Sequence, residues 1–234
     1  MKRFYRHTVS DRLTNFEVSY KETDLFISAC EDMRFEIFEY ARRLRIELEQ
    51  YIEKNREFLT SLVPVHFDKK APEIARDMMK GAQLSDVGPM ACVAGAFAKY
   101  VGHFILKRCR ECVVENGGDI FLKTEKPPIV GIYTNNEHFK DKLKIKLEKS
   151  EKPYGICSSS AKIGPSLSKG KADLALIVSN DAVLSDGLAT KTANMIKEKN
   201  DIKKAIEFAK SKNIIGCMFI KDDAVGIWGE VSLI

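Results

Sequence analysis

The sequence contains no long apolar stretch. No run of about 18 consecutive apolar residues occurs in the chain, which argues against a membrane-spanning helix. The basic N-terminus, residues 1–7, is not followed by the apolar run of a signal peptide. We therefore expect a cytoplasmic protein with no membrane partner.

Concentrated positive charge is also missing. Lys and Arg number 38 against 33 Asp and Glu, and the net charge of +5 is a mild excess. It suits phosphate-bearing ligands but lacks the dense basic patch of nucleic-acid-binding proteins. The 4 histidines are scattered and form no metal-ligand pattern. A hydrophobic content of 44% is ordinary for a globular protein, and we expect a single domain over residues 1–234.

The six cysteines stand at positions 30, 92, 109, 112, 157 and 217. In a cytosolic chain, thiols, ligands or core residues are expected rather than a disulfide framework. Cys109 and Cys112 form one CxxC pair, which is half of a four-cysteine zinc site. Chance placement, with Cys112 starting a strand, is the favoured interpretation of the pair. A metal, cluster or persulfide role would require Cys157 or another thiol to come close.

Strand and helix patterns alternate without a regular βαβ rhythm, so an α+β fold is predicted. Apolar spacing predicts helices over residues 33–55, 72–84, 88–109, 181–199 and 201–212, with Asp32 capping the first. Small residues at 91, 95, 98 and 102 predict that the third of these helices is central. Strands are predicted at 3–9, 15–20, 24–29, 113–115, 120–122, 129–133, 142–147, 154–157, 172–178, 214–220 and 224–230. The lysine alternation at 142–147 indicates a solvated edge strand or, alternatively, a phosphate-facing groove.

Two segments carry groups suited to phosphate. Asn116-Gly117-Gly118-Asp119 joins two apolar runs, and paired glycines expose backbone N–H groups that can cradle a phosphate. A plain hairpin turn is the alternative reading. Ser158, Ser159 and Ser160 offer three hydroxyls to a diphosphate or ribose, or form a simple polar loop. Cys157 beside them is a candidate nucleophile, although no histidine lies near it in sequence.

A third segment carries groups suited to a hard cation. Asp186 and Thr190 are four residues apart in a predicted helix, so a carboxylate and a hydroxyl lie on one face. The alternative is that Asp186 is a local cap and that Gly187 breaks the helix.

Taken together, residues 86–195 resemble the ApbE superfamily, whose characterised members are magnesium-dependent flavin transferases. Residues 95–100 resemble its Gly-Ala-x-Ala-Lys-Gly helix, and residues 116–120 its Gly-Gly-Asp turn. Residues 157–160 resemble its Thr-Ser-Gly segment, and residues 186–190 match its Asp-x-x-Ala-Thr. The order of the four motifs is that of the family. The resemblance implies an α+β fold related to the T-fold, with mixed sheets packed against long helices.

The resemblance also implies ligands and roles. FAD or a related dinucleotide would bind at the turn and serine segments and at Lys162, with Mg²⁺ on Asp186 and Thr190. Asp186 and Cys157 would be catalytic, and transfer or hydrolysis would occur at the diphosphate. A protein acceptor and a homodimer are the further partners expected.

One family element is absent. The His-x-x-Asp-Pro-x-x-Gly element should follow the serines, but residues 161–168 contain neither His nor Asp. Two alternatives to transfer therefore stay open. One is nucleotide binding without catalysis. The other is thiol-based handling of sulfide or persulfide in sulfur assimilation, for instance in homocysteine formation, by Cys109, Cys112 and Cys157.

Overall fold

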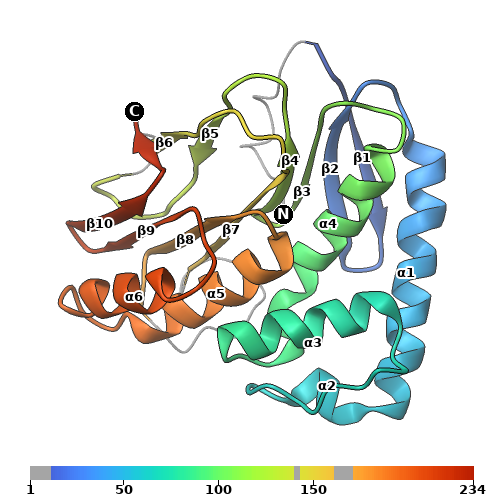
Figure 1. The fold of residues 1–234 in the computed structure, drawn as a ribbon, viewed down its shortest axis with the longest axis horizontal. Coiled ribbons are helices and arrows are strands. Elements are labelled where there is room, and N and C mark those ends of the chain that lie inside the picture. Colours follow the sequence, from blue (N-terminus) through green and yellow to red (C-terminus); the bar gives the residue numbers. More distant parts are fainter. Residues whose placement is uncertain (1–11, 140–142, 161–170) are drawn as a thin grey trace.

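An eight-stranded antiparallel sheet runs through the molecule (Figure 1). The computed structural model describes residues 12–139, 143–160 and 171–234, so the strand expected at 3–9 and the candidate Lys162 lie outside the described residues. The strand order is β1-β2-β3-β4-β7-β8-β9-β10. The bounds are β1 Thr14–Tyr20, β2 Thr23–Ala29, β3 Cys112–Asn116, β4 Asp119–Lys123, β7 Tyr154–Ser159, β8 Leu174–Ser179, β9 Gly216–Lys221 and β10 Ala224–Gly229.

Helices cover one face of this sheet (Figure 1). They are α1 Arg34–Lys54, α2 Arg56–Thr60, α3 Glu73–Ser85, the short η1 Pro89–Cys92, α4 Val93–Ile105, α5 Ala182–Met195 and α6 Asp201–Lys210. The prediction of a central small-residue helix is confirmed for α4. A Cβ on Gly102 would lie 2.1 Å from the Phe121 ring of β4, and one on Gly95 would lie 2.2 Å from the Ala182 carbonyl of α5. Side chains at these positions would push α4 away from both neighbours.

A second sheet of three strands covers the other face. Its order is β11-β6-β5, with bounds β5 Ile129–Ile132, β6 Leu143–Lys146 and β11 Ser232–Leu233. Its inner side chains pack on those of the large sheet, and Ile145 is fully buried there. Lys144 and Lys146 point to solvent as expected. The prediction of an edge strand was wrong, however, because β5 and β11 pair with β6 on both sides.

Within the large sheet, β4 and β7 share few paired residues. Only three residue pairs join these strands, against seven between β1 and β2 and six between β9 and β10. Two groups of strands therefore meet here: β1 to β4 with α4 above them, and β7 to β10 with α5 and α6. The candidate site lies over this junction.

Two local expectations needed correction. Gly187 does not break α5, which continues to Met195. A Cβ at Gly187 would lie 2.7 Å from Ser85 Oγ, so the glycine permits α3 and α5 to pack closely. At the start of α1, the N-cap residue is Met33 and not Asp32 as predicted, although the Asp32 carboxylate accepts a hydrogen bond from the Arg34 N–H at 2.9 Å.

Candidate functional site

The Gly-Gly segment forms a tight hairpin turn between β3 and β4. Gly117 and Gly118 have φ of 71° and 107°, values that side chains disfavour, and Asn116 pairs with Asp119 across the turn. The Gly118 N–H donates to Glu115 Oε1 at 2.9 Å. Asn116 Nδ2 donates to the Ala94 carbonyl at 3.2 Å, which fixes the turn against the start of α4. The segment is therefore a hairpin turn, and its position beside the start of α4 is fixed by a hydrogen bond.

The serine segment lies beside this turn. Ser158 Oγ in β7 donates to the Gly118 carbonyl at 3.4 Å. Ser158 and Ser159 are half-buried, and Ser160 is buried at the end of the strand. The structure therefore brings together two segments that are about forty residues apart, as the motif resemblance requires.

Asp186 is the buried carboxylate of the region. It lies in α5, and its Oδ2 accepts a hydrogen bond from the Gly95 N–H of α4 at 2.8 Å. Burial raises the pKa of Asp186 well above its ordinary value, and the nearby Asp119 carboxylate raises it further. The N–H groups of Gly95 and Ala94 act in the opposite direction. Two buried carboxylates, one from β4 and one from α5, are thus close enough for the charge of Asp119 to raise the pKa of Asp186.

A divalent cation would relieve this arrangement. Carboxylate and hydroxyl oxygens are the hard donors that Mg²⁺ prefers, and Mg²⁺ commonly takes one or two carboxylates together with phosphate oxygens and water. Thr190 lies one turn after Asp186 and is half-buried. Among the described residues no group of three His, Cys, Asp or Glu could hold a metal alone. The oxygen donors present fit a Mg²⁺ whose remaining ligands would come from a bound phosphate and water.

Cys157 lies next to the same carboxylates. It is fully buried in β7, and its thiol donates to the Ala182 carbonyl at 3.4 Å. Burial raises the pKa of Cys157 well above its ordinary value, and Asp119 and Asp186 add to this effect. A nucleophilic role needs the thiolate. This environment favours the neutral thiol, which can act as a hydrogen-bond donor.

The cysteines of the thiol hypothesis are not brought together. Cys109 forms a disulfide with Cys30, so the expectation that the cysteines are free thiols was wrong for this pair. The two residues are 79 positions apart, and only the packing of α4 beside β2 makes them neighbours. Cys112 is buried and donates to the Gly102 carbonyl at 3.7 Å. Cys157 belongs to a different apolar cluster, which packs against α5.

An ion network beside the site is built around Lys99, the lysine of the motif at residues 95–100. Lys99 Nζ in α4 lies 3.0 Å from Asp77 Oδ2 of α3 and 3.1 Å from Asp181 Oδ2. Asp181 is the N-cap of α5 and accepts from the Val183 N–H. Burial lowers the pKa of Lys99, but the two carboxylates together raise it above its ordinary value. Lys99 therefore stays charged and ties three helices together next to Asp186. The sequence signal was Lys99 inside a small-residue helix.

A Gly-Gly-Asp turn and an Asp-x-x-Ala-Thr helix, meeting over an antiparallel sheet, define an ApbE-like α+β protein. Solved structures share this fold. A point mutant of the flavin transferase ApbE from Vibrio cholerae has a TM-score of 0.60 at 12% identity, covering 93% of this chain and 97% of that one. The ApbE protein from Thermotoga maritima has a TM-score of 0.62 at 10% identity, covering 92% and 96%.

Sequence comparison gives the family. The family model described as AbpE bacteria matches residues 6–214, and the chain belongs to this family. The UPF0280 protein of Methanobrevibacter smithii is 40% identical over 202 residues, 83% of this chain and 85% of the relative. The UPF0280 protein of Methanocaldococcus jannaschii is 36% identical over 220 residues, 90% and 88% of the two chains. None of the helices in the described ranges is both long and apolar enough to cross a bilayer.

Proposed function

We propose that this protein binds a flavin dinucleotide, or a related dinucleotide, together with Mg²⁺ over the β4–β7 junction. The observation that carries the proposal is the buried pair Asp119 and Asp186, whose charges burial opposes and a cation would balance. The flavin part is supported by the likeness in fold to solved flavin transferases, and the diphosphate part by the neighbouring turn and serines.

The roles of the individual residues follow from their positions. The hydroxyls of Ser158 and Ser159 would donate to phosphate oxygens, and the turn at Gly117 and Gly118 would let a phosphate approach the backbone. Asp186 would hold the Mg²⁺, with Thr190 one turn further along the helix. When bound, Mg²⁺ would withdraw negative charge from the diphosphate oxygens.

Binding is the primary proposal, and transfer or hydrolysis at the diphosphate is the secondary one. Catalysis would require a group that replaces the missing His and Asp, and residues 161–170 lie outside the described residues. Cys157 would serve as a neutral donor beside Asp119 rather than as a nucleophile. A single domain, a protein acceptor, a homodimer and a cytoplasmic location stay predictions.

Calorimetric titration with FAD, in the presence and absence of Mg²⁺, tests the proposal. We expect Mg²⁺-dependent binding in the wild type and its loss in Asp186→Ala. Asp223→Asn removes an exposed carboxylate at the β9–β10 turn and should bind like the wild type. Binding that does not depend on Mg²⁺, or that survives in Asp186→Ala, would contradict the assigned metal site.

A product assay then separates binding from catalysis. The protein is incubated with FAD and Mg²⁺, and mass spectrometry follows the release of AMP and FMN. Release that Asp186→Ala abolishes would support chemistry at the diphosphate. Tight binding without any product would leave the protein as a nucleotide-binding member of the family.

A further inference from the structure

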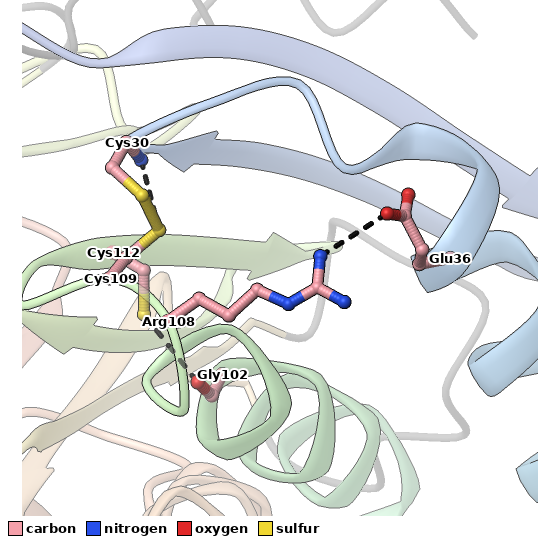
Figure 2. The surroundings of a disulfide bond; sticks show 6 residues. All are labelled: Cys30, Glu36, Gly102, Arg108, Cys109 and Cys112. Carbon is pink, nitrogen blue, oxygen red and sulfur yellow. Dashed lines mark hydrogen bonds and ion pairs between the residues drawn. A yellow bond between two sulfur atoms is a disulfide. The ribbon is translucent and has the colours of Figure 1, made fainter.

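The disulfide lies away from the proposed dinucleotide site, at the opposite end of α4. Cys30 directly follows β2, and Cys109 lies just after the end of α4, with the two Cα atoms 5.6 Å apart (Figure 2). Beside it, Arg108 Nη1 and Glu36 Oε1 form an ion pair at 3.3 Å that also joins the end of α4 to α1. Two connections, one covalent and one ionic, therefore fasten this end of α4.

The two sulfur-bearing residues differ in their access to solvent. Cys30 is exposed, whereas Cys109 is only 4% exposed. The other four cysteines are all buried, so Cys30 is the one exposed cysteine of the six. Exchange of a disulfide begins when a thiolate reaches one of its sulfurs, and access decides which sulfur is attacked. Of the two residues joined by the disulfide, Cys30 is therefore the one that an incoming thiol can approach from solvent.

The surroundings also favour Cys109 as the leaving sulfur. The backbone N–H of Cys30 donates a hydrogen bond to Cys109 Sγ at 3.3 Å. When the bond breaks, negative charge develops on Cys109 Sγ, and this N–H is already directed at it. This hydrogen bond is present before the disulfide is attacked.

The nearby Cys112 is a poor attacking group. It is buried, burial raises its pKa to about 12, and its thiol donates to the Gly102 carbonyl. In Figure 2 its sulfur is directed toward Gly102, on the α4 side of the disulfide. Rearrangement of the disulfide into the CxxC pair is therefore disfavoured, and the attacking thiol must come from outside the chain.

We propose that Cys30 is an exchange site for a small thiol. The incoming thiolate forms a bond to Cys30 Sγ, the bond between Cys30 and Cys109 breaks, and its electron pair goes to Cys109 Sγ, which then takes a proton. A second thiolate attacks the sulfur of the first equivalent in this mixed disulfide, the bond to Cys30 Sγ breaks, and its electron pair goes to Cys30 Sγ, which then takes a proton. The two equivalents leave as a small-molecule disulfide, and both cysteines are reduced. The end of α4 then keeps its ion pair between Arg108 and Glu36 and its apolar packing, but loses its covalent link to the end of β2.

Two single variants of the full chain test this asymmetry. Cys109→Ser leaves Cys30 as a free exposed thiol, and Cys30→Ser leaves Cys109 as a free buried thiol. Each folded variant is treated with cystine, and intact mass with peptide mapping locates the adduct. We expect Cys109→Ser to gain one cysteine adduct, on Cys30, at least about tenfold faster than Cys30→Ser gains any. In urea the two variants should react at similar rates.

A second experiment uses the wild-type protein, without any substitution. The oxidised protein is treated with a limiting amount of cysteine and quenched with acid, and the mixed disulfide should map to Cys30. An adduct on Cys109 or Cys112, or equal rates for the two folded variants, would overturn the proposal. Circular dichroism confirms that both variants are folded before their rates are compared.

Discussion

The substitution Asp186→Asn is expected to stabilise the metal-free protein while it removes Mg²⁺-dependent binding. An asparagine keeps an oxygen that can accept from the Gly95 N–H, a hydrogen bond of 2.8 Å in the wild type. It removes a buried charge that also faces Asp119. Relief of this kind at a binding site is worth about 1–2 kcal/mol in the free energy of unfolding.

The direction of the pH dependence follows from the raised pKa. The folded-state pKa of Asp186 lies above its unfolded value. The contribution of Asp186 to the free energy of unfolding is therefore complete at low pH and is lost as pH rises through the folded-state pKa. The wild type without Mg²⁺ should therefore lose stability over this range relative to Asp186→Asn. Added Mg²⁺ should stabilise the wild type and leave the variant unchanged.

Urea unfolding in EDTA and in Mg²⁺, at a series of pH values, measures both effects. The expected gain corresponds to a rise of roughly 0.5 M in the urea midpoint. Asp186→Ala is the comparison variant, because it removes the same charge but leaves the Gly95 N–H without its acceptor, and it should be about 1–3 kcal/mol less stable than Asp186→Asn. If Asp186→Asn proved as unstable as Asp186→Ala in EDTA, the reasoning about the buried charge would be refuted.

Three further outcomes are expected. Reduction should destabilise the wild type by about 4.5 kcal/mol, because the disulfide closes a loop of 79 residues, and Cys30→Ser should unfold in urea identically with and without reductant. An unchanged midpoint on reduction of the wild type would contradict this. Lys99→Met should cost about 1–3 kcal/mol, because it leaves Asp77 and Asp181 without their shared cation, and Lys99→Arg should recover part of the loss. Equal midpoints for both Lys99 variants would exclude the ionic explanation. Gly118→Ala should cost about 1–2 kcal/mol because of its positive φ, and should weaken FAD binding in the same calorimetric assay. A variant with unchanged stability would show that the turn tolerates a side chain.

Elements with strong local patterns could be predicted from the sequence. The apolar spacing over residues 33–55 predicted α1, and the strands predicted at 15–20, 24–29, 214–220 and 224–230 correspond to β1, β2, β9 and β10. The short α2 and β11 were missed, since five and two residues carry too little periodicity to be recognised. The position of β6 in the middle of its sheet depends on β11, so it could not be read from the lysines of β6 alone.

The candidate site was predictable as a set of motifs but not as a geometry. The order of the motifs indicated that the Gly-Gly-Asp turn and the Asp186 helix belong together. The position of Asp119 beside Asp186 depends on tertiary packing, as does the network around Lys99. The disulfide was missed for the same reason, because its two cysteines come from segments 79 residues apart that carry no common pattern.

The short pairing between β4 and β7 has a mechanical consequence. Three residue pairs join the two groups of strands there. Because so little backbone pairing holds β4 to β7, the sheet is expected to separate most easily between these two strands. Asp119 belongs to one group, and Asp186 and Ser158 belong to the other. A ligand that contacts all three would act as a clamp across the weakest line of the sheet. The two groups of strands would then be harder to pull apart when the site is occupied than when it is empty.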